Sequence, residues 1–375
     1  MSAESHPVRS AQIHDTNRVA AAHGDTWSSA ATGDGTVYVL SCDTQGFAAN
    51  LAPLGVNLAI SKLRIDGSDV HVDLVNPMLT VPSHYGLQGE MKYDADGGFR
   101  MWKGNSLAYI DDVMYLSISR HGDMTPASRY IQDARNASII KSLDYGLSWE
   151  RVERQNYLHP MFPNDTFSVP FFVQYGTMPV DGQSREVLPD GAEDHVYAIS
   201  NDGYWNNGNW MKVGRVPRGR LSQLDPSDWE WFCADVSASE NAESAADAWS
   251  ADPTRATQVL LADGQLSQSG IQYLWPLRRY VMLQWFYPSP YKGNFDTSRT
   301  VWRFYEAPKP WGPWTSFFEQ EFDPTGFYNP EILVTSVQAE EGGARATVLT
   351  AGDWRTNMEP DSAYRLQLVD VTFRT

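Results

Sequence analysis

The sequence predicts an all-β fold, and three observations support this. The stretch IIKSLDYGLSWERV (139–152) joins an apolar, β-branched run to a tight turn, as a β-hairpin does. Similar strand–turn–strand units recur along much of the chain. Amphipathic helical patterns are scarce, and the 22 Pro and 28 Gly fall mostly between the expected strands. Repeated antiparallel units of this kind indicate a β-propeller.

The turn that follows the first of these strands contains Ser142, Asp144, Gly146, Ser148 and Trp149. Asp and Ser side chains can bond nearby backbone N–H groups, glycine can adopt positive φ, and the tryptophan can pack beneath the turn. The pattern resembles the Asp-box of sialidases and other β-propellers, which lies on an outer hairpin of a blade. We therefore interpret Asp144 as a structural residue, away from any active site.

Related strand pairs predict a five-bladed β-propeller that forms a single domain over residues 1–375. GTVYVLSCDTQGF (35–47) and HVYAISNDGYW (195–205) each end a strand in Ser-x-Asp, as the first unit does. A β-sandwich with insertions is the rival architecture, and the repeated Ser-x-Asp strand ends count against it. Each blade is expected to be a four-stranded antiparallel sheet, over the approximate ranges 35–75, 100–155, 190–235, 268–318 and 328–372.

The composition restricts the classes of partner. Aromatic residues make up 13% of the chain, which suits both repeated β-folds and clefts where rings stack on sugars. A net charge of −17 argues against nucleic acids and anionic membranes. With only Cys42 and Cys233, neither a disulfide framework nor a cysteine-based zinc site is available. We expect a monomer whose partner is a polysaccharide, with no nucleic-acid or membrane partner.

The N-terminal residues carry no apolar core of signal-peptide length, and no later stretch reads as a membrane span. We expect a secreted or cell-envelope protein given in its mature form. A cytoplasmic protein is the alternative.

A propeller brings the ends of its innermost strands together around a central channel, so site residues should be scattered along the chain and close to strand ends. Glycoside hydrolysis needs one protonated and one ionised carboxyl group, which burial and neighbouring charge can provide. Asp25 in HGDTW and Asp43 in LSCDTQGF are flanked by small or aromatic residues and not by basic partners, which fits a channel wall, with an ordinary turn carboxylate as the alternative for each. The carboxylates near expected strand ends are Asp25, Asp43, Glu90, Asp202, Glu331 and Asp353.

A second group of residues is expected to bind the substrate. Its two tryptophans would stack on sugar rings, with a core position as the alternative for each. Its three carboxylates would orient sugar hydroxyls or hold a catalytic group. No cofactor is required, although converging carboxylates and carbonyls could hold a structural calcium ion in the channel. The group comprises Glu90, Trp102, His121, Asp202, Trp205 and Asp353.

Other chemistries find less support. The sequence has no Gly-x-Ser-x-Gly elbow, no P-loop and no Gly-x-Gly-x-x-Gly after a strand, and its eight histidines lack metal-ligand spacing. Lyase chemistry on uronates would use a Tyr/His pair with basic residues. Tyr85, Arg120 and His121 allow that reading without singling it out.

With these residues in view, the chain resembles glycoside hydrolase family 183, a former family of unknown function whose members are endo-D-arabinofuranases with a five-bladed propeller. The resemblance runs nearly end to end, through GDTW, KGNSLAYIDDVMYL, KSLDYGLSW, EAPKPWGPWT and GFYNPEI. It implies cleavage within furanoside polymers by two acidic residues of the N-terminal blade, and the matching positions are Asp25 and Asp43. Because Asp43 lies beside Phe47 at the mouth of a strand, we expect it to be the nucleophile or base, and Asp25 the acid.

Two alternatives stay open. A related five-bladed glycosidase could act on L-arabinan, xylan or another glycan, since the likeness is weaker in loops 123–135 and 155–190. A non-catalytic, lectin-like propeller would use tryptophans as stacking platforms and would not need both aspartates. Fold alone cannot choose among these functions. The candidate platforms are Trp102, Trp205, Trp285 and Trp354.

Overall fold

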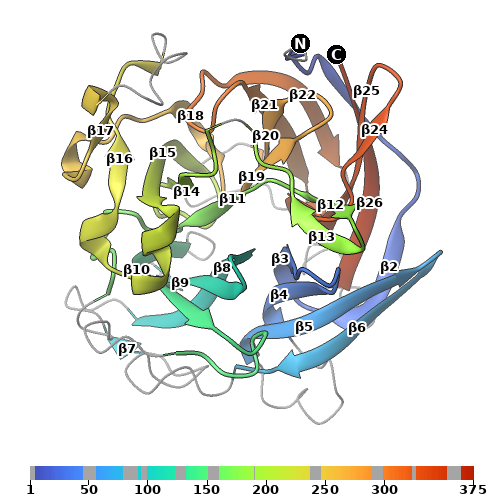
Figure 1. Ribbon diagram of the computed structural model, residues 1–375, viewed down its shortest axis with the longest axis horizontal. Coiled ribbons are helices and arrows are strands. Elements are labelled where there is room, and N and C mark those ends of the chain that lie inside the picture. The colour runs from blue at the N-terminus through green and yellow to red at the C-terminus, as the bar shows by residue number, and fades with distance from the viewer. Residues whose placement is uncertain are drawn as a thin grey trace.

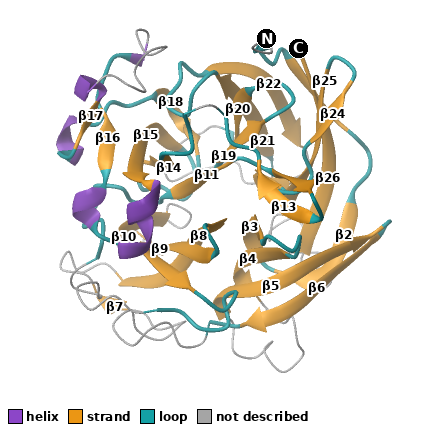
Figure 2. Ribbon diagram, in the orientation of Figure 1, coloured by secondary structure: helices purple, strands orange, loops and turns teal. Residues whose placement is uncertain are grey.

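The computed structural model is a ring of antiparallel sheets around a central axis (Figure 1). Strands make up nearly all of its regular structure, with a few short 3-10 helices on the outside of the ring (Figure 2). The described residues form five blades, which confirms the predicted all-β five-bladed propeller. The structure describes residues 5–44, 56–78, 92–93, 99–123, 132–150, 160–189, 191–236, 246–288, 299–322, 327–352 and 365–375.

The first two blades take their strands in chain order from the axis outwards. The first blade begins at Asp25 and not near residue 35, and its innermost strand is buried along its whole length. It consists of β3 (Asp25–Ala31), β4 (Val37–Thr44), β5 (Val56–Asp66) and β6 (Asp69–Asn76). The second blade consists of β8 (Phe99–Ile110), β9 (Val113–Asp123) and β10 (Gln132–Ser142), with β7 (Lys92–Tyr93) paired to β8.

Blades three and four are joined at the axis, because their innermost strands β11 and β19 pair in parallel. Blade three consists of β11 (Phe171–Gln174), β14 (His195–Asn201), β15 (Gly208–Pro217), β16 (Glu230–Phe232), β17 (Trp249–Ser250) and β18 (Leu260–Leu266). Blade four consists of β19 (Ile271–Leu274), β20 (Arg279–Phe286), β21 (Thr300–Ala307) and β22 (Thr315–Phe322). A separate ribbon pairs β12 (Thr177–Val180) with β13 (Gln183–Glu186). The 3-10 helices span Arg218–Gln223, Pro226–Asp228, Ala246–Ala248 and Pro253–Arg255.

The fifth blade is built from both ends of the chain, which the sequence did not reveal. Strands from the N-terminus form its outer edge by pairing with the C-terminal strand, so the two termini lie side by side (Figure 1). This pairing closes the ring. The blade consists of β23 (Phe327–Ile332), β25 (Gly343–Gly352) and β26 (Arg365–Arg374), with β24 (Gln338–Glu340), β1 (Ser10–Ile13) and β2 (Arg18–His23).

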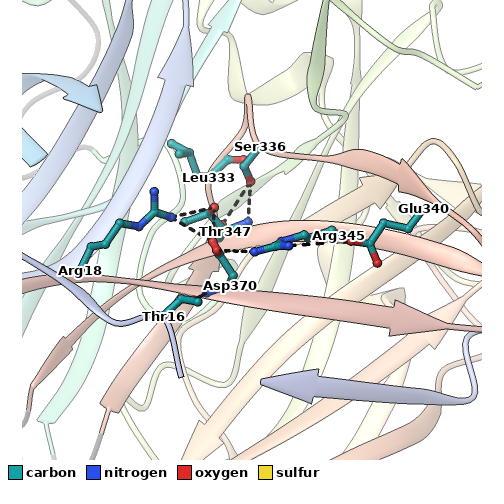
Figure 3. A network of polar contacts seen from close by, with 8 residues as sticks. All are labelled: Thr16, Arg18, Leu333, Ser336, Glu340, Arg345, Thr347 and Asp370. Carbon is teal, nitrogen blue, oxygen red and sulfur yellow. Dashed lines mark hydrogen bonds and ion pairs between the residues drawn. The ribbon is translucent and has the colours of Figure 1, made fainter. Parts of the chain in front are cut away.

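A polar network fixes this closure (Figure 3). Asp370 on β26 accepts hydrogen bonds from Arg18 Nη2 at 2.9 Å, Thr347 Oγ1 at 2.8 Å and Arg345 Nη2 at 2.8 Å. Arg18 comes from the N-terminal β2, and the other two donors come from β25. One carboxylate therefore ties together three strands that span nearly the whole sequence.

The hydrophobic core lies between neighbouring blades. Leu40 of β4 packs with Trp102 and Leu107 of β8 in one apolar cluster, so the faces of blades one and two share a core. A Cβ atom at Gly104 would lie 2.8 Å from Leu40, and the two blades thus approach as closely as a glycine permits. No helix in the described residues has the length and apolar character needed to cross a membrane.

The turn predicted after residue 142 has the expected structural role. Ser142 Oγ accepts from the Gly146 backbone N at 2.8 Å, and Asp144 accepts from the Ser148 backbone N at 2.8 Å and the Ser148 hydroxyl at 2.6 Å. Gly146 has φ +85°, and Trp149 packs against the core shared by blades one and two. This hairpin follows β10, which lies two strands out from the axis, so Asp144 belongs to the fold and not to the channel.

Candidate active site at the channel

The innermost strands run in the same direction around the axis. Leu107 N donates to Ser28 Oγ at 3.0 Å, while Cys42, opposite Asp25, contacts the Gly104 carbonyl, so β3 and β8 advance together. We call the face of the ring where these strands begin the start face. There the second strand of each blade ends, as the pairs Asp25–Cys42, Met101–His121, Phe171–Ile199, Ile271–Met282 and Phe327–Gly352 show.

Asp25 is the first residue of β3 and is only 3% exposed. Thr26 Oγ1 donates to its Oδ1 at 3.2 Å. The backbone is strained at the β-branched Thr26, which has φ +47°, while Gly24 on the other side has φ +148°, a value that glycine adopts readily. The register also shifts between Asp25 and Ser28. Strain of this kind concentrates where a fold holds a functional side chain in a required position.

Asp43 lies on β4 directly after Cys42, the residue that pairs with Asp25. The backbones of the two aspartates therefore sit on adjacent strands at the start face of blade one. The side chain of Asp43 lies outside the described residues, and so do Glu90, Asp353 and Trp354. The assignment of Asp43 as nucleophile or base stays a prediction.

Glu331 occupies the interior of the ring on β23. Ser28 Oγ donates to its Oε1 at 2.8 Å, linking blade five to blade one. Burial raises the pKa of the Glu331 carboxyl to about 8, although hydrogen bonds from Ser28 and the Ser29 backbone lower it partway. It borders a cavity of about 10 Å³, room for about one water molecule, beside Gln174 and Gln272.

Polar side chains tie the innermost strands together at the level of Glu331. Ser106 Oγ accepts from the Phe172 backbone, and Gln174 Nε2 donates to the Leu107 carbonyl at 2.7 Å. Sequence reasoning named Glu331 as a strand-end carboxylate without giving it a role, and it missed Gln174 and the serines altogether. The available signal was a run of small hydroxyl residues inside apolar strands, as in TWSSAA and GNSLAY.

His121 lies at the end of β9 on the start face and is 1% exposed. Its Nε2 is 3.2 Å from Gln268 Nε2 and 3.4 Å from Asn105 Oδ1. Gln268 lies in the segment between β18 of blade three and β19 of blade four, so this contact joins blade two to that segment. The role of His121 in binding a substrate stays a prediction.

The two predicted stacking rings differ in their surroundings. Trp102 is 1% exposed, and the Arg120 guanidinium lies 5.5 Å from its ring. It thus holds the core position that the sequence left as its alternative, and as described it presents no open face to a sugar. Trp205 is half-buried and meets Trp285 edge-on, with ring centroids 5.0 Å apart.

Asp202 follows β14 on the start face and serves the turn there. Its Oδ2 accepts from the Asn209 backbone N at 3.0 Å and from Asn209 Nδ2 at 2.7 Å. Of the predicted site residues, the register thus brings six to the start face, on blades one, two and three. They are Asp25, Asp43, Trp102, His121, Asp202 and Trp205.

In the part of the chain that the structure describes, no three His, Cys, Asp or Glu side chains converge as metal ligands. The calcium ion expected in the channel stays a prediction.

Comparison with solved structures finds a protein of similar fold. An N-acetylgalactosamine deacetylase from F. plautii, solved with blood group B trisaccharide, is similar at a TM-score of 0.50 and 11% identity, covering 99% of this chain and 94% of its own. The likeness lies in the fold. The xyloglucan PUL GH43B of Bacteroides ovatus has a TM-score of 0.48 and 12% identity, covering 96% of this chain and 53% of its own. The arabinanase Arb43A of Bacillus subtilis has a TM-score of 0.47 and 11% identity, covering 94% of this chain and 95% of its own.

The chain spans about half the length of the Bacteroides ovatus protein and of several other similar solved structures. No family model and no curated protein matches the sequence. At these identities the substrate has to be argued from the residues of the site.

Proposed function

We propose that the protein is a glycoside hydrolase that cleaves within furanoside polymers, D-arabinan foremost. Asp25 acts as the acid and Asp43 as the nucleophile or base. The position of Asp25 carries the proposal. It is a buried carboxylate at the start of the innermost strand of blade one, flanked by two residues at positive φ.

The chemistry follows from the placement of the two aspartates on adjacent strands. The protonated acid gives its proton to the glycosidic oxygen as the bond to the leaving sugar breaks. The ionised partner either activates a water molecule that attacks the anomeric carbon, or attacks that carbon itself. In the second case, water activated by the other carboxyl group then releases the bound sugar from the enzyme. His121, Asp202 and Trp205 at the same face would orient the sugars that flank the cleaved bond.

Two features favour this function over the lectin-like alternative. A lectin needs open aromatic faces, but Trp102 and Trp285 are 1% and 0% exposed, which removes two of its four candidate platforms. Strain around a buried carboxylate is also more useful to a catalyst than to a sugar platform. A glycosidase acting on L-arabinan or xylan would use the same residues with differently shaped loops.

The experiment is to incubate the protein separately with D-arabinan, L-arabinan and xylan and to analyse the released oligosaccharides. We expect a ladder of fragments from D-arabinan. Asp25→Asn and Asp43→Asn should each lower turnover by about 10²- to 10⁴-fold, because each removes a proton donor or a charge from the reaction. Melting temperatures should change little.

The matched control is Asp263→Asn, an exposed carboxylate on β18, which should retain parental activity. Near-parental activity in both aspartate variants would overturn the assignment. Fragments from L-arabinan or xylan alone would keep the reaction class and change the substrate.

A further inference from the structure

The exposed apolar side chains of the molecule are unevenly distributed. Among the described residues, five large hydrophobic side chains are exposed, and three of them lie on the Asp-box hairpin of blade two: Leu143 (61%), Tyr145 (47%) and Leu147 (64%). A turn needs none of these side chains, because its hydrogen bonds come from Ser142, Asp144 and Ser148. Grouped apolar exposure of this kind marks a binding surface.

Two of these side chains, Tyr145 and Leu147, border a groove between the hairpin and the outer strands of blade one, which we call the rim groove. Its volume is about 350 Å³, within the range of sites that hold small molecules. Blade one contributes one side and the hairpin the other. It is lined by Tyr38, Lys62, Asp73, Leu74, Val75, Tyr145 and Leu147.

Three tyrosines form a stepped stack beside the rim groove. The Tyr145 ring lies 6.0 Å from that of Tyr38 with 9° between their planes, and 6.1 Å from that of Tyr109 with 24° between them. Tyr38 is buried, so Tyr145 is the member of its pair that meets solvent. Lys62 Nζ lies 5.6 Å from the Tyr38 ring on the blade-one side.

The stack is held in place before any ligand arrives. Tyr145 sits at φ +60° inside the hydrogen-bonded turn. Asn76 Nδ2 of blade one donates to the Gly146 carbonyl at 2.9 Å and the Leu147 carbonyl at 3.1 Å, which locks the hairpin to the other wall. A ligand would therefore meet a formed surface and lose little free energy in ordering it.

We propose that the rim groove binds a neutral glycan. A sugar has an apolar C–H face that packs on aromatic rings and a hydroxyl edge that needs donors and acceptors. The rim groove supplies aromatic and aliphatic surface together with one lysine and one aspartate, so its charges balance. An anionic ligand would in addition meet a chain of net charge −17. A purely apolar peptide would leave both charges unpaired.

This site is distinct from the channel. Tyr38 pairs with Ala30 near the end of β3, whereas Asp25 begins that strand, so the two sites lie at opposite ends of blade one. A polymer held at the rim groove would raise the local concentration of further segments at the channel. This benefit rests on the proposed function, whereas the binding itself does not.

The test is native gel electrophoresis through gels that contain D-arabinan, L-arabinan or xylan, in which retardation gives the dissociation constant for each glycan. We expect at least one of these glycans to retard the parent protein. Tyr145→Ala should weaken that binding about five- to tenfold, and Leu147→Ala should weaken it less. Tyr145→Phe should stay within about twofold of the parent, because the ring remains. Leu261→Ala, a matched exposed apolar change on β18, should have no effect.

Melting temperatures of all variants separate loss of binding from loss of fold. Parental retardation of folded Tyr145→Ala and Leu147→Ala, or no retardation of the parent by any of the three glycans, would overturn the proposal. Asp25→Asn distinguishes the two sites, since it should lose hydrolysis and keep retardation. If Asp25→Asn stays active, the catalytic assignment fails while binding at the rim groove stands.

Discussion

Glu331 holds a proton in the middle of the molecule. With a pKa of about 8 it is mostly neutral at pH 7, so it adds no negative charge next to Ser28 and blade one. An anion there would disfavour ionisation of a nearby carboxyl group, such as that of Asp25, which begins the strand that carries Ser28. A neutral Glu331 therefore adds no like-charge repulsion to an ionised carboxylate there.

This state has a consequence for stability. Between the ordinary pKa near 4.5 and the folded value near 8, the unfolded chain loses the Glu331 proton while the folded chain keeps it. The free energy of unfolding should therefore fall as pH rises through this window, by roughly 1 kcal/mol per pH unit from this group. Glu331→Gln stays neutral and can still accept from Ser28, so it should be increasingly more stable than the parent from pH 5 to pH 8.

Thermal unfolding at pH 4, 6 and 8 measures this difference. Glu341→Gln, an exposed neighbour on the same blade, is the control and should track the parent throughout. A gap between Glu331→Gln and the parent that stays constant with pH would contradict the assigned protonation state.

At the scale of elements, the hairpin after β10 is stabilised by hydrogen bonds among its own residues. Ser142 Oγ accepts from two backbone N–H groups, of Gly146 and Asp144, and donates to Asp144 Oδ1 at 2.8 Å. Burial raises the pKa of Asp144, but hydrogen bonds from Ser148 and Ser142 outweigh it and leave that pKa lowered. The hydrogen bonds of the Ser142 and Asp144 side chains are thus made within the turn itself.

Ser142→Ala removes the acceptor for these N–H groups in a buried position. We expect a loss of about 1–3 kcal/mol in the free energy of unfolding, measured by denaturant titration. Hydrolysis should stay parental, because the hairpin lies away from the channel. Ser227→Ala, which removes a hydroxyl from an exposed turn, is the control and should cost less than about 0.5 kcal/mol. A loss of hydrolysis in folded Ser142→Ala would place the hairpin in the catalytic machinery.

Features that depend on residues close together in the sequence could be predicted, and features that depend on distant residues could not. The Asp-box turn and the strands around it could be predicted because their signals lie within a dozen residues of one another. The pairing of β1 and β2 with β26 could not, since nothing near residues 10–23 indicates a partner at the other end of the chain. Asp25 was named as a strand-end carboxylate and does begin β3, while its catalytic role stays a prediction. Gln174 was missed because its contact depends on a neighbouring blade.

At the scale of the whole molecule, the contacts of Asp370 hold the ring closed. Burial raises the pKa of this carboxyl, but hydrogen bonds from Arg345 and Thr347 and the charges of Arg18 and Arg345 outweigh it and hold that pKa below its usual range. Stability from these contacts is therefore fully present above about pH 4 and is lost as pH falls through the folded pKa.

Asp370→Asn should lower the free energy of unfolding by about 1–2 kcal/mol at pH 7, a figure reduced because the carboxylate is partly solvated. The gap between variant and parent should shrink below pH 4. Asp66→Asn, which removes the exposed pairing of Asp66 with Arg64, is the control and should change stability by less than about 0.5 kcal/mol. A gap that persists unchanged at pH 2 would show that charge at Asp370 does not fix the closure.

The closure also sets an order of events in the cell. His14 and Thr372, which meet through a 2.8 Å contact, are separated by 358 positions. During synthesis β1 and β2 leave the ribosome before their partner β26, so they must wait through translation of the four blades between. Until then the edge of β1 is an open template for other chains. A ribosome that pauses before β26 is made would thus lengthen the period in which nascent chains can pair with one another.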